Sequence, residues 1–257
     1  GVLEVLFASG HELVDEGAMQ EVIERSLAAG RRDLAELTRI TFARQRFMQG
    51  RIAEASALLA LAEEMAAETD DGGVRAWAVG LRAEIDRAEG HTKAARSLLR
   101  AEIERPYYRQ NTNHLLGCLT QLCDLDLGDG DPGAAMSLAE QALELARDTN
   151  DRFQLPYVLT HAGQAALLLG DLDRADQLLA SAEAAERETR PTPASSFQLE
   201  EIRLARAAVS AAKGERARPA AEPEIALRFF EEHGMPIPAT SQLLYDRFLR
   251  GRAADDA

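Results

Sequence analysis

Four glycines recur at intervals of 40 residues along this chain, and each lies between two small residues at fixed distances. An alanine follows each glycine by five residues, and a small residue precedes each by seven. The glycines are Gly50, Gly90, Gly130 and Gly170; the alanines are Ala55, Ala95, Ala135 and Ala175; the preceding residues are Ala43, Ala83, Cys123 and Gly163. A fixed period in this range is typical of arrays built from one supersecondary unit per repeat.

The segments between these marks have the apolar spacing of amphipathic helices. Leu155, Leu159 and Ala162 share one helical face before Gly170, and glycine is the residue that best accepts the left-handed backbone after a helix. Asp171 can then cap the N-terminus of the next helix. The small residues mark the place where two antiparallel helices of a hairpin touch, so added bulk there is expected to be destabilising.

The sequence therefore predicts an all-α fold, a right-handed superhelical solenoid of antiparallel helix hairpins with a 40-residue period. We expect one array over residues 1–257: a half repeat at 1–30, full repeats at 31–70, 71–110, 111–150 and 151–190, a degenerate repeat at 191–235, a capping helix at 236–250 and a disordered tail at 251–257. Helices are expected near 3–9, 16–29, 33–49, 52–68, 74–89, 92–104, 112–127, 132–147, 154–169, 172–187, 195–213, 221–233 and 239–250.

These columns resemble those of tetratricopeptide repeats, which have a small residue in the first helix and two alanines in the second. The second alanine column reads Ala62, Glu102, Ala142 and Ala182, so one repeat departs from the pattern. The period is also longer than the usual length of about 34 residues. In this respect the chain is similar to the repeat regions of bacterial LuxR-type and maltose-activator-like ATP-binding transcriptional regulators. The resemblance covers roughly residues 30–215 and implies a sensor and oligomerisation arm, with the nucleotide- and DNA-binding domains elsewhere.

Composition argues against several classes of function. The net charge is −14, from 29 basic and 43 acidic residues, and an acidic surface repels the phosphates of nucleic acids. We find no apolar run of about 18 residues that would span a membrane. The first residues carry neither a methionine nor a signal peptide, so we expect a cytoplasmic segment of a longer protein. Cys118 and Cys123 face different sides of one expected helix, which disfavours a disulfide between them.

Motifs of catalysis are not found in the sequence, and we predict that the protein is not an enzyme and needs no cofactor or metal. Four aspartates lie close together, but they do not have the glycine and distal glutamate of a calcium-binding loop. They are Asp124, Asp126, Asp129 and Asp131. The five histidines have no ligand spacing.

The candidate binding surface is the concave face that the first helices of successive repeats would line. Aromatic residues and arginines, which dominate recognition hot spots, gather on it. The predicted site residues are Arg44, Phe47, Trp77, Glu84, Arg87, Thr120, Asp124, Tyr157, Thr160 and Gln164. The alternative interpretation is that the aromatic side chains pack between repeats and the charges face solvent. The adjacent Tyr107 and Tyr108 form a second candidate, although one tyrosine covering the core is the favoured reading.

The sequence thus predicts a non-catalytic module that binds a peptide, a protein segment or a small effector. By resemblance, it would be the sensor region of a larger bacterial transcriptional regulator. A stand-alone adaptor or assembly scaffold is one alternative, and a peptide-pheromone receptor module is another. Self-association into a homo-oligomer is a further option, whereas no direct binding to nucleic acid or to membranes is expected.

Overall fold

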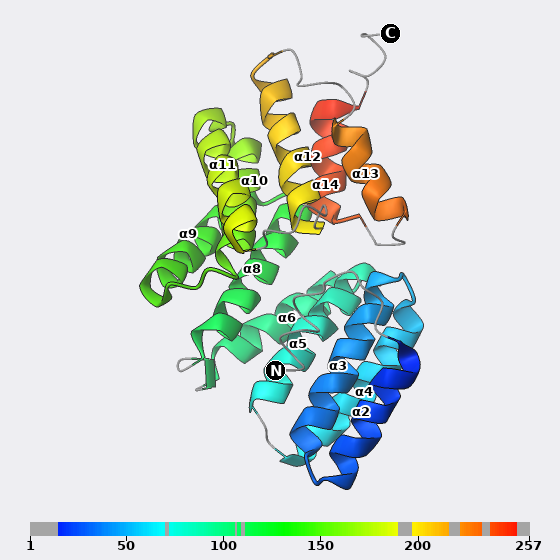
Figure 1. Ribbon diagram of the computed structural model, residues 1–257. Helices are drawn as coiled ribbons and strands as arrows, with labels where there is room; N and C mark the ends of the chain where they lie inside the picture. Colours follow the sequence, from blue (N-terminus) through cyan, green and yellow to red (C-terminus); the bar gives the residue numbers. More distant parts are fainter. Residues whose placement is uncertain are drawn as a thin grey trace. The chain divides into compact units, whose positions relative to one another are not determined.

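The computed structural model describes residues 15–69, 72–105, 107–108, 111–189, 197–215, 222–232 and 237–250. Within these residues all regular structure is helical and no strand occurs, which confirms the all-α prediction (Figure 1). The expected helix at 3–9 and the tail at 251–257 lie outside the described residues. The chain divides into two compact units, Gly1–Tyr107 and Tyr108–Ala257.

Consecutive helices pack against one another in the first unit. They are α2 (Glu16–Ala28), α3 (Arg32–Met48), α4 (Ile52–Thr69), α5 (Gly72–Ala88) and α6 (Thr92–Ile103). Besides these sequential contacts, α3 packs directly on α5. First helices of neighbouring hairpins therefore touch in this unit, as expected for stacked helix pairs.

The second unit continues this pattern. Its elements are α8 (Thr112–Gly128), α9 (Pro132–Thr149), α10 (Leu155–Leu169), α11 (Leu172–Thr189), α12 (Phe197–Ala212), α13 (Glu222–Glu232), α14 (Ala239–Leu244) and the π-helical turn η1 (Tyr245–Leu249). The first helices α8, α10 and α12 contact one another in order. The segment expected to be a capping helix, α14 with η1, packs on α12, and α14 also contacts α8 (Figure 1).

The periodic glycines end the first helix of each hairpin. All four have positive φ, between 71° at Gly50 and 85° at Gly170. In the Gly170 turn, the glycine N–H donates to the Leu167 carbonyl at 3.0 Å and the Asp171 N–H to the Ala166 carbonyl at 2.9 Å. This Schellman arrangement satisfies carbonyls that the helix end leaves without a partner. Gly30 and Gly214 form the same turn, so it also occurs outside the 40-residue series.

The small residues of the repeat lie in close contacts between the two helices of a hairpin. Ala135 and Ala175 are fully buried, as are their counterparts Ala55 and Ala95. The Cys123 thiol donates to the Ala135 carbonyl at 3.2 Å, which places the two small columns against each other. At Gly163 an added Cβ would lie only 2.6 Å from Cγ of Leu179. A larger side chain at this point would force the two helices apart.

Glu102, which occupies an alanine position of the repeat, is buried as an ion pair. Its side chain is 3% exposed, and both carboxylate oxygens accept from Nε of Arg75 at 3.1 Å. A second nitrogen of Arg75 also donates to the carboxylate, and Nε of Arg105 lies 3.6 Å away. Arg75 belongs to α5 and Glu102 to α6, so a charge-assisted bond joins the two helices at the position where other repeats have the second alanine.

Replacing Gly163 with alanine should lower the free energy of unfolding by about 1–3 kcal/mol, since the new methyl group overlaps Leu179. Gly117→Ala is the matched control in the same unit: it lies inside α8, and an added Cβ meets nothing within 4 Å. This control should be stabilised by roughly 0.5–1 kcal/mol, because alanine favours a helix over glycine. Urea unfolding followed by circular dichroism measures both. Equal effects of the two substitutions would contradict the close contact at Gly163.

The two partners of the buried ion pair should respond unequally to truncation. Arg75→Ala leaves the buried carboxylate with Arg105, whose Nε lies 3.6 Å away, as its ion-pair partner among the described residues, and should cost about 3 kcal/mol of unfolding free energy. Glu102→Ala leaves Arg75, whose side chain is 40% exposed and can be hydrated, and should cost about 1 kcal/mol. Urea titrations of the two variants give the comparison. A loss for Glu102→Ala that equals or exceeds the loss for Arg75→Ala would contradict this prediction.

Candidate functional site

In the first unit we call the surface formed by α3 and α5 the first-helix face, and in the second unit the same name denotes the separate surface formed by α8, α10 and α12. Every predicted site residue lies on one of these helices. Arg44 and Phe47 are on α3; Trp77, Glu84 and Arg87 are on α5; Thr120 and Asp124 are on α8; Tyr157, Thr160 and Gln164 are on α10. The exposure of these side chains differs between the two units.

In the first unit, an ion pair joins two predicted site residues of neighbouring first helices. One nitrogen of Arg44 lies 3.0 Å from both carboxylate oxygens of Glu84, and the side chains are 31% and 22% exposed. Trp77 and Arg87 of α5 are half-buried, whereas Phe47 is part of the core. The Arg44–Glu84 pair is therefore partly exposed, as are Trp77 and Arg87, whereas Phe47 does not belong to the surface.

In the second unit, three of the predicted site residues are buried, and their side chains form hydrogen bonds inside the protein. Thr160 accepts from Nε2 of Gln198 at 2.8 Å, and Nε2 of Gln164 donates to Oε1 of Glu201 at 3.1 Å. Thr120 donates to the Leu116 carbonyl within its own helix. Two of these bonds join α10 to α12, so they satisfy polar groups that would be costly to bury alone.

Asp124, the fourth polar position predicted in this unit, is covered by the C-terminal segment. The Thr240 hydroxyl of α14 donates to Oδ1 of Asp124 at 3.1 Å, and Nε2 of His161 lies 3.8 Å from the same oxygen. Thr240 is fully buried. Tyr157 is half-buried, and its backbone carbonyl bonds to Nδ1 of His161 at 2.8 Å. The chain itself therefore occupies this part of the first-helix face.

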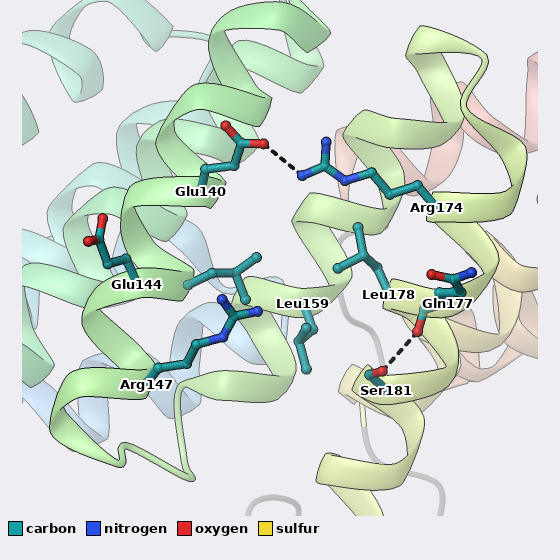
Figure 2. Close-up of a pocket in the computed structure, with 9 residues that line it drawn as sticks. Glu140, Glu144, Arg147, Leu159, Arg174, Gln177, Leu178 and Ser181 are labelled. Atoms are coloured by element: carbon teal, nitrogen blue, oxygen red, sulfur yellow. Dashed lines mark hydrogen bonds and ion pairs between the residues drawn. The ribbon is translucent and has the colours of Figure 1, made fainter.

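A groove of about 660 Å³ lies on another side of the second unit, between α9 and α11 (Figure 2). Leucines of α9, α10 and α11 form part of its lining, and charged and polar side chains form the rest. An ion pair bridges it, because Arg174 of α11 lies 2.6 Å from Glu140 of α9. The lining residues are Glu140, Leu143, Glu144, Arg147, Leu159, Arg174, Gln177, Leu178 and Ser181.

The sequence-based prediction does not include this groove, because it places the binding surface on the first helices of the repeats. A signal was present: Glu140, Glu144 and Arg147 are spaced by four and three residues, which places them on one face of α9. The lining residues of α11 show the same spacing from Arg174 to Ser181. The sequence does not reveal that α9 and α11 leave space between these faces, since that depends on how both pack on α10.

Groups with metal-binding or nucleophilic chemistry are few among the described residues. One cluster, Asp86, Glu89 and His91, brings three ligand atoms within 4.8 Å of one another at the end of α5. It is largely exposed, and partial burial raises the pKa of the Asp86 carboxyl. Cys118 and Cys123 are both buried and form no disulfide bond. Desolvation raises the pKa of the Cys123 thiol, which keeps that thiol protonated.

The fold and these contacts define a helical repeat-like protein whose helices are compatible with a solenoid. No protein-family model matches the sequence, and no curated protein matches it either. The resemblance to tetratricopeptide repeats and to LuxR-type regulators therefore rests on the residue columns alone. Among the described helices, none combines the length and the apolarity needed to cross a lipid bilayer.

Proposed function

We propose that this chain is a non-catalytic recognition module that binds a peptide or protein segment on the first-helix face of its first unit. The observation that supports this most directly is the Arg44–Glu84 pair, which stays partly exposed on the same helices as Trp77 and Arg87. In the second unit, by contrast, the side chains of Thr160 and Gln164 are buried and form hydrogen bonds from α10 to α12.

The chemistry of this surface favours a ligand segment with both charge and apolar character. Arg44 and Arg87 carry planar guanidinium groups, which bind carboxylates through paired hydrogen bonds, and a ligand carboxylate would compete with Glu84 for Arg44. Trp77 packs partly against the apolar core of this unit and keeps part of its surface accessible, and Trp and Arg are enriched among binding hot spots. A segment that places a carboxylate beside an apolar side chain matches these groups.

Our wider proposal is that the module serves as the sensor region of a larger bacterial transcriptional regulator. It is supported by the long-period repeat columns, which resemble those of LuxR-type activators, and by the strongly acidic net charge, which disfavours direct contact with DNA. The sequence of the complete gene tests it. A phosphate-binding loop or a helix-turn-helix in the same polypeptide would support this role. A complete gene with neither would contradict it without affecting the proposed binding surface.

Peptides selected from a random dodecapeptide display library on the full chain should shift the fluorescence of Trp77, which is the only tryptophan. The double variant Arg44→Glu with Glu84→Arg keeps an ion pair but exchanges its charges. We expect this exchange to weaken peptide binding about tenfold or more, equivalent to ~1.4 kcal/mol. Fluorescence titration measures the affinity, and circular dichroism checks that helicity is unchanged.

The matched control exchanges another ion pair of the first unit, Glu21→Arg with Arg25→Glu on α2. This pair is highly exposed, with side chains 79% and 66% accessible for Arg25 and Glu21. The control should bind the selected peptides as the natural chain does. Peptides that bind both exchanged variants equally, or that leave Trp77 emission unchanged, would place the binding site elsewhere.

A further inference from the structure

We propose that residues 237–250 act as an internal ligand of the second unit. The surface beneath them, formed by α8 and α12, would be a binding site for a short helix that presents a hydroxyl side chain and, one turn later, a leucine. The chain's own segment occupies this site until a partner segment of the same chemistry displaces it. This proposal concerns the second unit and does not depend on the binding surface proposed for α3 and α5.

One hydrogen bond and several apolar contacts hold this segment against the second unit. Thr240 donates its hydroxyl proton to Asp124, and Cβ of Ala239 lies 3.8 Å from the position that a Cβ on Gly128 would take. Leu244 is fully buried and Leu249 is 7% exposed, and both belong to the apolar core of the second unit. These are the features of a helix held in a groove by spaced anchor residues.

The segment is too short to be a stable helix in isolation. The α-helical part spans only Ala239–Leu244, much shorter than the roughly 12–15 residues at which isolated helices become stable. It continues as the π-helical turn η1, a rare conformation that is frequent at functional sites. Its helical structure therefore depends on the surface under it.

One buried hydroxyl of the segment has no hydrogen-bond partner among the described residues. Ser241 is fully buried, and within the described part of the chain its hydroxyl oxygen has no hydrogen-bond partner. A buried polar group without a partner costs about 1–3 kcal/mol. The internal segment thus binds less tightly than the groove permits, and a partner helix with an apolar residue at this position would compete well.

The test uses a fluorescent peptide of residues 237–250 and the full chain, with binding followed by fluorescence anisotropy. In the natural chain the internal segment competes, so the apparent affinity is reduced by the fraction of chains with an open site. Leu244→Ala weakens the internal segment and should raise the affinity for the added peptide about tenfold. Gly128→Phe places a bulky ring where Ala239 sits, and should abolish peptide binding.

Ile225→Ala serves as the control, because this side chain on α13 is 52% exposed, and peptide affinity should match that of the natural chain. A self-associated chain that dissociates when the peptide is added would also support the proposal, with a second copy as the partner. Equal peptide affinity in Leu244→Ala and in the natural chain, or no binding in either, would overturn it.

Hydrogen exchange on the natural chain gives a second test that does not depend on any variant folding. If the segment detaches as a unit, the amides of α14 and η1 should exchange at least about tenfold faster than those of α12, because they open without global unfolding. Exchange of all three elements at one rate would show that the segment is a permanent part of the core, and would contradict the proposal.

Discussion

The close approach of the two helices within each hairpin is the contact on which the rest of this structure depends. At Gly163 the approach is so close that a single added methyl group would overlap Leu179. At Cys123 it allows the thiol to reach a backbone carbonyl of the opposite helix. The first helices of neighbouring hairpins are also in contact, as in the α3–α5 and α10–α12 pairs. These contacts between first helices involve polar side chains as well as apolar ones.

Polar pairs across these contacts, one of them partly exposed and another buried, fix how neighbouring hairpins align. Arg44 meets Glu84 across the α3–α5 contact, and Gln164 meets Glu201 across the α10–α12 contact. Apolar surfaces tolerate a shift of one helix along another, whereas a shifted polar group loses its partner and becomes costly to bury. The apolar columns therefore hold the hairpins together, and the polar pairs select one alignment among several that would bury similar apolar area.

The helices and their ends were predictable from sequence because they depend on local chemistry. Gly170 ends a helix and Asp171 caps the next, as the residue types indicated. The positions of Thr160 and Gln164 on a first helix were also predictable, but their burial was not. It depends on partners in α12, which lie 37 and 38 residues away without a shared periodic position. Asp124 is covered by Thr240, 116 residues distant, and no local pattern reveals such a contact.

The Arg75–Glu102 pair has a consequence for how an array like this can change its length. Both residues belong to the α5–α6 hairpin, so this ion pair would be copied or removed as a whole. Removal of the hairpin would nevertheless take Glu84 away from Arg44 of α3, and Arg82 away from Glu63 of α4. The Arg44–Glu84 pair spans two hairpins, so inserting a hairpin between α3 and α5 would separate an acid from its base. Gene duplication within the array would therefore be tolerated at some hairpin boundaries and penalised at others.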